Sequence, residues 1–463
     1  MSGLWFESVL LPSGWARDVR IVSDGAHIAR ITEGTPPEPG DERHRLALPG
    51  LPNLHSHAFQ RALAGLTERR GPSQDNFWSW RELMYRFVGK LGPEELEAIS
   101  ALAFTEMLEA GFTRVGEFHY LHHDQDGGTF ADPAELAGRI AAAAAESGIG
   151  LTLLPVFYAH GGFGGAPPTP RQRRFITDPH GFARLVEGCR RAVSPLSDAI
   201  VGIAPHSLRA VTPEELAAVL PLAQGGVIHI HIAEQIREVQ ECLGWSGRRP
   251  IEWLLEHAQV DERWCLVHAT HADDAELSAV AARGAVVGLC PLTEANLGDG
   301  IFPGAAFLAQ GGRIGVGSDS NILIDAAGEL CMLEYSQRLA SRARNVLAGG
   351  ADGSTGRTLF DAALAGGAQA LRGMAAAAGP VALPARAGLA AGAPLDLITL
   401  ASEHPALIGR GGDETLDSWI FAGARELIDC VWRGGIKLVS GGRHRAHEAI
   451  VARYARALSR LRA

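Results

Sequence analysis

Residues 46–57 read LALPGLPNLHSH, an apolar run that ends in two histidines, His55 and His57. Seven similar runs follow, separated by stretches of helical character: TRVGEFH (113–119), GLTLLPVFY (150–158), AIVGIAPH (199–206), VIHIHIAE (227–234), WCLVHAT (264–270), GAVVGLCP (284–291) and RIGVGSD (313–319). Alternating β and α segments are typical of a parallel sheet, and eight βα units can close into a barrel. The sequence therefore predicts an α/β fold, a (β/α)8 barrel of the TIM type, with its active site at the carboxyl ends of the strands.

Both ends of the chain lie outside this pattern. Residues 1–47 and 391–463 contain short runs of strand character, and residues 441–463 have the character of a closing helix. We expect a small β-domain built from both termini (1–47 and 391–463) beside a barrel domain over 48–390. Within the barrel domain, the alanine-rich stretch 374–378 is expected to be helical, and the Gly/Pro-rich stretch 160–175 to be a lid or a disordered loop.

Length, composition and charge fit a large enzyme and disfavour several other classes of protein. The 463 residues, 46% of them hydrophobic, suit a barrel plus an attachment. With 42 Lys and Arg against 52 Asp and Glu, the net charge of −10 disfavours nucleic acid or an anionic membrane as the main partner. We expect no membrane span and no secretion signal, because no apolar run reaches about 18 residues and the start of the chain lacks a basic region before an apolar core. Six scattered cysteines without a C-x-x-C pair predict a reduced, cytoplasmic protein.

Histidines and an aspartate gather at the predicted strand ends. Residues i and i+2 of a strand share a face, so His55 and His57 can chelate one ion. The alternative for such residues is a core histidine, and we interpret His229 in that way. His231 lies in the fifth run and Asp319 ends the eighth, where a buried carboxylate is costly without a cation or hydrogen-bond partners. Three histidines, an aspartate and a water suit a catalytic zinc, which lowers the pKa of its water to about 7.

Two further side chains lie where they can move or orient protons beside such a metal. Glu234 follows His231 by three residues and is predicted to be a proton shuttle. The alternative is a carboxylate that only begins the next helix. His268, near the end of the sixth run, can orient the attacking hydroxide or polarise the group under attack. Asp319 can also accept a proton from the water.

The ordered set H-x-H, H-x-x-E, H and D is similar to the deaminase branch of the amidohydrolase superfamily. Longer motifs narrow the resemblance: PNLHSHAFQRALAGL, FWSWRELMYRF, EFHYLHH, APHSLRAV, HIHIAEQ and LCPLTEANLGDGIFP together resemble the formimidoylglutamate deiminase family of histidine degradation. The resemblance covers essentially the whole chain. It implies a (β/α)8 amidohydrolase with a single zinc that converts N-formimidoyl-L-glutamate and water to N-formyl-L-glutamate and ammonia.

The resemblance also implies roles for individual residues. The metal ligands would be His55, His57, His231 and Asp319. The catalytic groups would be Glu234, His268 and Asp319. The substrate contacts would be Gln60, Arg81, Tyr120, His206 and Arg209. The planar fork of an arginine suits the carboxylates of such a substrate, a small molecule with two of them.

The resemblance further implies one metal per chain and a homodimer. Many amidohydrolases bridge two metals through a carboxylated lysine at the end of strand four, where this chain has His206. Its only lysines, Lys90 and Lys437, lie near no predicted barrel strand end. Iron or manganese in place of zinc stays open, because both can occupy sites with nitrogen and oxygen ligands.

Two other functions remain as alternatives. The first is a nucleobase or triazine deaminase of the same superfamily, whose flat substrate would favour aromatic stacking and amide contacts over two arginines. The second is an inactive binding or scaffold relative, which is disfavoured because none of the expected metal ligands is missing.

Overall fold

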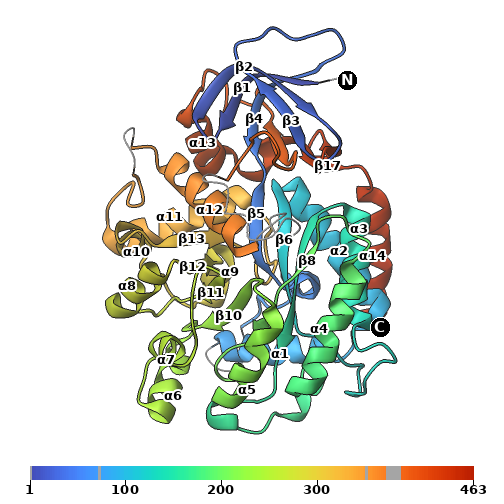
Figure 1. The fold of residues 1–463 in the computed structure, drawn as a ribbon, viewed down its shortest axis with the longest axis vertical. Helices are drawn as coiled ribbons and strands as arrows, with labels where there is room; N and C mark the ends of the chain where they lie inside the picture. The colour runs from blue at the N-terminus through green and yellow to red at the C-terminus, as the bar shows by residue number, and fades with distance from the viewer. Residues whose placement is uncertain (1–2, 71–74, 350–352, 372–386, 463) are drawn as a thin grey trace.

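The computed structural model describes residues 3–70, 75–349, 353–371 and 387–462. Within these residues a β-rich layer built from both ends of the chain lies over a larger body of strands and helices (Figure 1). The alanine-rich stretch 374–378 lies outside the described residues.

All eight predicted apolar runs contribute strands to a parallel barrel. The strands are β5 (Leu51–Ser56), β6 (Phe112–His119), β7 (Gly150–Phe157), β8 (Ile200–Val201), β9 (Ala204–Pro205), β10 (Ile228–Ile232), β11 (Trp264–His268), β12 (Val286–Leu289) and β13 (Arg313–Val316). One parallel sheet runs from β5 to β9 and another from β10 to β13. Parallel bridges between Ile203 and Ile228 and between Ser56 and Asp319 join the two sheets at both edges. The predicted (β/α)8 fold is confirmed.

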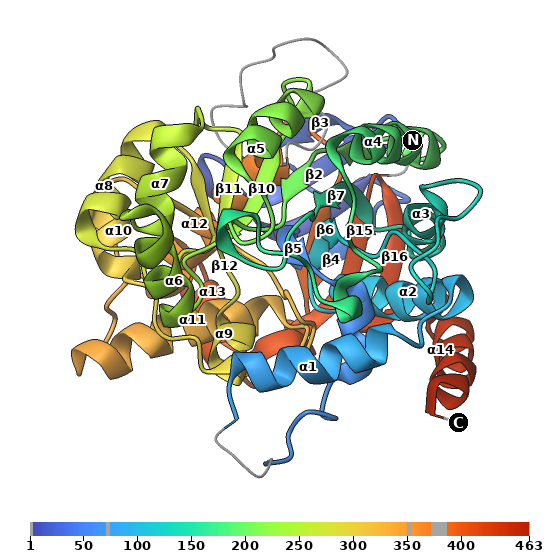
Figure 2. The same ribbon diagram turned by 90° about the horizontal axis from the view of Figure 1, so that it is seen from below.

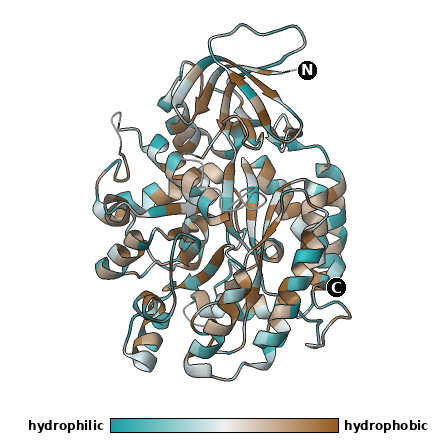
Figure 3. Cartoon of the chain, in the orientation of Figure 1, coloured by the Kyte–Doolittle hydropathy of each residue, from teal (hydrophilic) through white to brown (hydrophobic). Residues whose placement is uncertain are grey.

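Burial explains why these strands read as continuous apolar runs. Parallel strands covered by helices have no solvent face, so both side-chain rows are apolar. All eight residues of β6 and of β7 are buried, and Figure 3 shows apolar residues along the strands of the barrel.

The helices surround these strands (Figure 2). They are α2 (Pro93–Glu109), α3 (Glu135–Ser147), α4 (Pro179–Val193), α5 (Pro213–Val219), α6 (Ile236–Ser246), α7 (Pro250–His257), α8 (Asp274–Arg283), α9 (Pro291–Leu297), α10 (Gly304–Ala309), α11 (Ala326–Ser341) and α12 (Thr355–Leu371). An extra helix, α1 (Phe77–Val88), lies in the long insertion after β5. None of the helices in the described part of the chain has the length and apolar character that a membrane crossing requires.

The terminal segments form one eight-stranded sheet. Its strands are β1 (Leu4–Leu11), β2 (Gly14–Ser23), β3 (Ile28–Thr32), β4 (Glu42–Pro49), β14 (Leu397–Leu400), β15 (Ile428–Arg433), β16 (Ile436–Ser440) and β17 (Arg443–His444). Their order is β17-β16-β15-β14-β4-β1-β2-β3, so β4 joins the N-terminal strands to the C-terminal ones. Two helices, α13 (Asp413–Ser418) and α14 (His447–Arg462), complete this part of the chain, and α14 packs against α2. The exact domain boundaries, 1–47, 48–390 and 391–463, stay a prediction.

The run 46–57 is divided between the terminal sheet and the barrel. Its sequence does not reveal this division. Its first residues lie in β4 of the terminal sheet, and residues 51–56 form β5 of the barrel. Gly50 stands between them, and a Cβ there would lie 2.2 Å from the Thr113 side chain. The change of sheet therefore occurs at a position where the chain passes too close to β6 for any side chain.

The stretch 160–175 is an ordered loop. Its Gln172 side chain donates a hydrogen bond to the Tyr158 hydroxyl at 2.7 Å, and Phe175 is fully buried. Arg174 donates to the carbonyl of Leu91, which anchors the loop to the segment after α1. The disordered alternative is therefore wrong, because the loop has its own buried contacts. Its action as a lid stays a prediction.

Candidate active site

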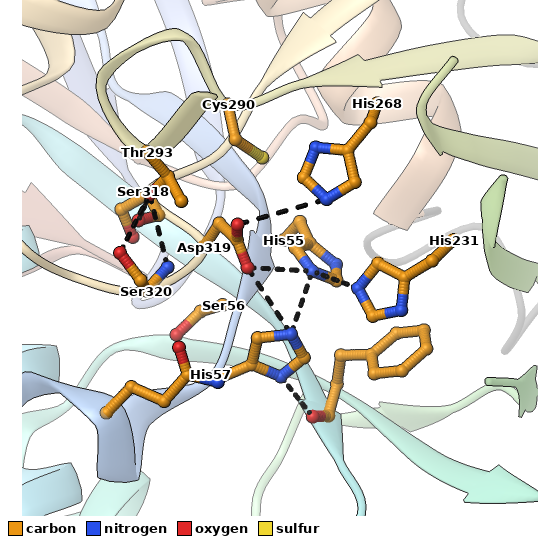
Figure 4. A network of polar contacts seen from close by, with 12 residues as sticks. His55, Ser56, His57, His231, His268, Cys290, Thr293, Ser318, Asp319 and Ser320 are labelled. Carbon is orange, nitrogen blue, oxygen red and sulfur yellow. Dashed lines mark hydrogen bonds and ion pairs between the residues drawn. The ribbon is translucent and has the colours of Figure 1, made fainter. Parts of the chain in front are cut away.

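Four side chains from three barrel elements point at one spot at the strand ends. His55 lies near the end of β5 and His57 directly after that strand, His231 lies in β10, and Asp319 follows β13 (Figure 4). The His55 Nε2 lies 3.2 Å from the His57 Nε2 and 3.0 Å from the His231 Nε2. The Asp319 Oδ1 lies 3.4 Å and 3.3 Å from the same atoms of His55 and His57.

This geometry fits a metal ion. Ligand atoms at the usual distance of about 2.0–2.1 Å from a tetrahedral zinc stand roughly 3.3 Å from one another. The four distances above are close to that value, and all the ligand atoms lie within 4.8 Å of one another. All four are buried. The Nε2 atoms of the histidines face one another and the Asp319 carboxylate. Without a cation, these buried nitrogens would lack enough hydrogen-bond partners.

Backbone carbonyls aim two of the histidines. The His57 Nδ1 donates to the carbonyl of Phe118 at 2.9 Å, and the His231 Nδ1 donates to the carbonyl of His206 at 3.1 Å. Because a carbonyl can only accept, each ring carries its proton on Nδ1 and presents the lone pair of Nε2 to the cluster. Burial lowers the pKa of His57 and His231 and that of His55, to about 3, so the three rings are neutral ligands at neutral pH.

The turn after β13 places Asp319 in an unusual backbone conformation. Asp319 has φ of 43°, in the left-handed region. Its N–H donates to the carbonyl of His55 and its carbonyl accepts from the N–H of His57, so the ends of β13 and β5 hold each other. Burial alone would raise the pKa of Asp319, but the hydrogen bond to His55 and the interactions with the imidazoles of His55, His268 and His57 outweigh it and lower the net pKa. The carboxylate is therefore ionised and suited to a cation.

Glu234 and His268 lie beside the cluster. Both are buried, and the Glu234 Oε1 lies 3.8 Å from the His268 Nε2. Burial raises the pKa of Glu234, as a group that carries a proton at neutral pH requires. Burial alone would lower the pKa of His268, but the charges of Glu234 and Asp319 and the hydrogen bond to Glu294 raise it overall.

Glu294 is a site residue that the sequence did not reveal. Its Oε1 accepts from the His268 Nδ1 at 3.2 Å and from the Cys290 N–H at 2.9 Å. It lies in the first turn of α9, directly after the end of β12. The sequence signal for it is weak, because a glutamate in the first turn of a helix after a barrel strand is common.

All the predicted substrate and proton-transfer residues line one cavity, which has about 560 Å³ of empty space with its open mouth included. The lining includes His57, Gln60, Arg81, Tyr120, His206, Arg209, His231, Glu234, His268 and Asp319. His55 lies beneath the floor and is fully buried. Sequence reasoning did not identify the aromatic and apolar residues that complete the walls: Phe77, Trp80, Met84, Tyr85, Tyr158, Phe175 and Leu297.

Two arginines present donors to this cavity. The Nε atoms of Arg81 and Arg209 are buried and have no hydrogen-bond partner among the described residues. The guanidinium of Arg81 lies 4.5 Å from the ring centroid of Trp78, and that of Arg209 lies 5.8 Å away. In the same lining, the Gln60 amide donates to the Tyr120 hydroxyl at 2.9 Å. The cavity thus combines a metal-type cluster with two cationic forks.

Neither lysine is near the cluster. The Lys90 Nζ donates to the carbonyl of Leu461 in α14, and Lys437 pairs with Glu42 in the terminal sheet. His206 follows β9 and lines the cavity, as expected. His229 donates through its Nε2 to the carbonyl of Ala370 at 3.0 Å, which supports its interpretation as a core histidine.

Comparisons with known proteins identify the family. The model of the amidohydrolase family matches residues 46–423, and that of the N-terminal domain of formimidoylglutamate deiminase HutF matches residues 1–45. The formimidoylglutamate deiminase of Pseudomonas aeruginosa is 50% identical, with 100% of each chain covered. The chain belongs to the formimidoylglutamate deiminase family of amidohydrolases.

Solved structures agree with the fold. A crystal structure of an amidohydrolase from Brucella melitensis superposes on this member of the formimidoylglutamate deiminase family with a TM-score of 0.94, at 52% identity and with 100% of both chains covered. An adenosine deaminase from Xanthomonas campestris, solved with bound zinc, has a TM-score of 0.79 at 21% identity and covers 99% of this chain and 98% of its own. At that identity the second likeness shows the fold alone.

Proposed function

We propose that this protein hydrolyses N-formimidoyl-L-glutamate to N-formyl-L-glutamate and ammonia. The observation that carries the proposal is the pair of arginines, Arg81 and Arg209, which face the same cavity as the histidine–aspartate cluster. The name of the Pseudomonas aeruginosa relative supports the same substrate. In the reaction, water adds to the formimidoyl carbon, and the bond from that carbon to the terminal nitrogen breaks.

The metal proposed for the cluster is one zinc per chain, held by His55, His57, His231 and Asp319. When bound, it supplies a water with a pKa of about 7 and so makes hydroxide available at neutral pH. The neutral rings of the three histidines and the ionised Asp319 suit a divalent cation. A second group of side chains with metal-ligand chemistry, His268, Cys290 and Glu294, lies next to this cluster. Burial raises the pKa of Cys290 and keeps it a neutral thiol, whereas a metal binds the thiolate, so we do not assign a metal to this second group.

Two side chains carry the proton transfers, and a third orients the attacking water. Asp319 accepts the proton of the attacking water. His268 lies 3.9 Å from the Asp319 Oδ2 and helps to orient that water. Glu234 gives a proton to the imine nitrogen and then takes the proton of the added hydroxyl, while Asp319 passes its proton to the same nitrogen, so that the tetrahedral carbon expels ammonia and the formyl carbonyl forms. General acid–base help of this kind contributes roughly 10²- to 10⁴-fold in rate.

The remaining lining residues bind the parts of the substrate other than its formimidoyl group. Arg81 and Arg209 bind its two carboxylates, since each guanidinium can offer two parallel N–H donors to a carboxylate. Gln60, Tyr120 and His206, which line the same cavity, offer further hydrogen bonds. The family expectation of a cytoplasmic homodimer is part of this proposal.

Exchange of each arginine for methionine tests the substrate assignment. Arg209→Met or Arg81→Met keeps much of the side-chain bulk and removes the fork. Catalytic efficiency toward N-formimidoyl-L-glutamate should fall about tenfold or more, because hydrogen bonds to a charged group contribute roughly 1.5–3 kcal/mol each. Zinc content should not change. Arg237→Met is the matched control, because Arg237 also packs on Trp78 but is exposed and pairs with Glu241.

Two results would contradict the substrate assignment. The first is an Arg209→Met variant with undiminished efficiency. The second is a wild-type enzyme that converts N-formimidoylglycine, which lacks one carboxylate, as well as the glutamate derivative.

The aromatic residues of the cavity wall are compatible with a second candidate function. Trp80, Tyr158 and Phe175 line the cavity and would suit a flat ring, as in a nucleobase or triazine deaminase. The buried guanidinium of Arg209 and the half-buried one of Arg81 have no partner on such a ring, however, so this candidate is the weaker one.

A further inference from the structure

Glu238 is a buried carboxylate that lies behind the active site and does not line its cavity. It stands in the first turn of α6 and is fully buried. One oxygen accepts from the N–H of Ala233 at 3.2 Å and the other from the N–H of Glu234 at 3.1 Å. The carboxylate therefore binds the turn that carries Glu234.

The turn at Ala233 and Glu234 needs a stabilising contact such as the one from the Glu238 carboxylate. Ala233 has φ of 50°, a left-handed conformation that is unfavourable for alanine. The helix cap, Gln235, makes no side-chain capping bond. Glu238 is an acceptor in the first turn of the helix, where the exposed N–H groups favour a negative charge.

Glu238 also faces Arg209. The Arg209 Nη2 lies 4.0 Å from the Glu238 Oε2 and 3.9 Å from the Glu234 Oε2. A buried guanidinium requires a counter-charge. In the proposed reaction Glu234 gains and loses a proton, so its charge changes during turnover. Glu238 does not line the cavity and takes no part in that proton transfer.

We propose that Glu238 is a positioning residue that fixes Glu234 and Arg209 relative to each other. The Glu238 carboxylate then sets the distance between Glu234, which protonates the imine nitrogen, and Arg209, which binds a substrate carboxylate. The inference rests on the proposed function and adds to it a specific link between catalysis and substrate choice.

Glu238→Gln tests the link, because the amide keeps the volume but removes the charge. Its NH2 group would also face a backbone N–H, donor against donor. For N-formimidoyl-L-glutamate we expect kcat to fall and KM to rise, each by about tenfold, with the metal content unchanged.

Two double-mutant cycles separate the two effects. In an Arg209→Met background, Glu238→Gln should raise KM no further. In a Glu234→Gln background, Glu238→Gln should lower the residual kcat no further. A carboxylate that served only to stabilise the fold would give the same factor in every background.

Glu334→Gln is the matched control. Glu334 is also fully buried, accepts from two consecutive backbone N–H groups, those of Val346 and Leu347, and pairs with Arg338. It lies outside the cavity lining, so its variant should lose a similar amount of thermal stability and keep wild-type kcat and KM. If Glu238→Gln does not fold, Glu238→Asp, which keeps the charge but shortens its reach, should still lower kcat.

Three outcomes overturn the inference: wild-type kinetic constants in a folded Glu238 variant, additive losses in both backgrounds, or equal kinetic losses in the Glu334 control. Each leaves the proposed function intact if the wild-type enzyme releases ammonia from N-formimidoyl-L-glutamate. A wild-type enzyme without that activity overturns the proposed function and this inference together.

Discussion

At the residue scale, Glu234 and His231 have different roles, because His231 directs a nitrogen lone pair at the metal cluster and Glu234 does not. His231 presents its Nε2 to His55, whereas Glu234 faces His268 and Arg209. Glu234→Gln should therefore keep the zinc and lose roughly 10²- to 10⁴-fold in kcat, the usual contribution of a general acid. His231→Ala should lose both metal and activity.

Ammonia release and elemental analysis of the same preparations check this pair of variants. Glu241→Gln, a change on the same helix α6 at a half-buried residue outside the lining of the active-site cavity, is the control and should behave as wild type. Near wild-type turnover in Glu234→Gln would show that its assigned role is wrong.

Some site residues could be found from sequence and others could not, for a physical reason. His55, His57, His231, His268 and Asp319 fall at the ends of apolar runs, and strand ends meet at one edge of a barrel. Glu294 and Glu238 act through neighbours, and their position in a helix turn is common for any glutamate. The aromatic walls come from loops and from α1, whose approach to the cavity depends on tertiary packing.

At the element scale, Gly50 separates the terminal sheet from the barrel. A methyl group there would meet Thr113 at 2.2 Å, so Gly50→Ala should destabilise the protein by about 1–3 kcal/mol, as overpacked cores do. Gly138→Ala is the control, because Gly138 lies in α3 with no atom within 4 Å of its added Cβ. That helical change should be neutral or stabilising. Thermal unfolding measures both, and equal effects would refute the steric account of Gly50.

The strands of the barrel were predictable because burial on both faces makes them apolar throughout. The division of residues 46–57 was not, because the end of β4 (LALP, 46–49) and the start of β5 (LP, 51–52) are both apolar and the change of sheet leaves no break in the pattern. The terminal sheet was expected from both ends of the chain, but its strand order depends on β4 pairing with β14, a contact of long sequence separation.

At the scale of the whole molecule, the metal cluster joins the two parallel sheets of the barrel. His55 belongs to the sheet of β5 and His231 to that of β10. A bound ion should therefore stabilise the whole barrel, by about 2.7 kcal/mol at a metal concentration of 100 times Kd. Chelation should lower the unfolding temperature and abolish activity, and added zinc should restore both.

His231→Ala is the control for the chelation experiment and should be insensitive to the chelator. Elemental analysis of the wild type should give close to one zinc per chain. Two tightly held metals, both needed for activity, would contradict the single-metal proposal.

The central claim is that a cavity with two arginines and one metal cluster selects a linear amidine with two carboxylates. The most direct test measures ammonia release by the purified enzyme from N-formimidoyl-L-glutamate, from guanidino acids, and from guanine, adenosine and a triazine at equal concentrations. The proposal predicts the highest kcat/KM for N-formimidoyl-L-glutamate, with N-formyl-L-glutamate as the product, and little or no release from the rings. Faster turnover of any ring substrate would contradict it.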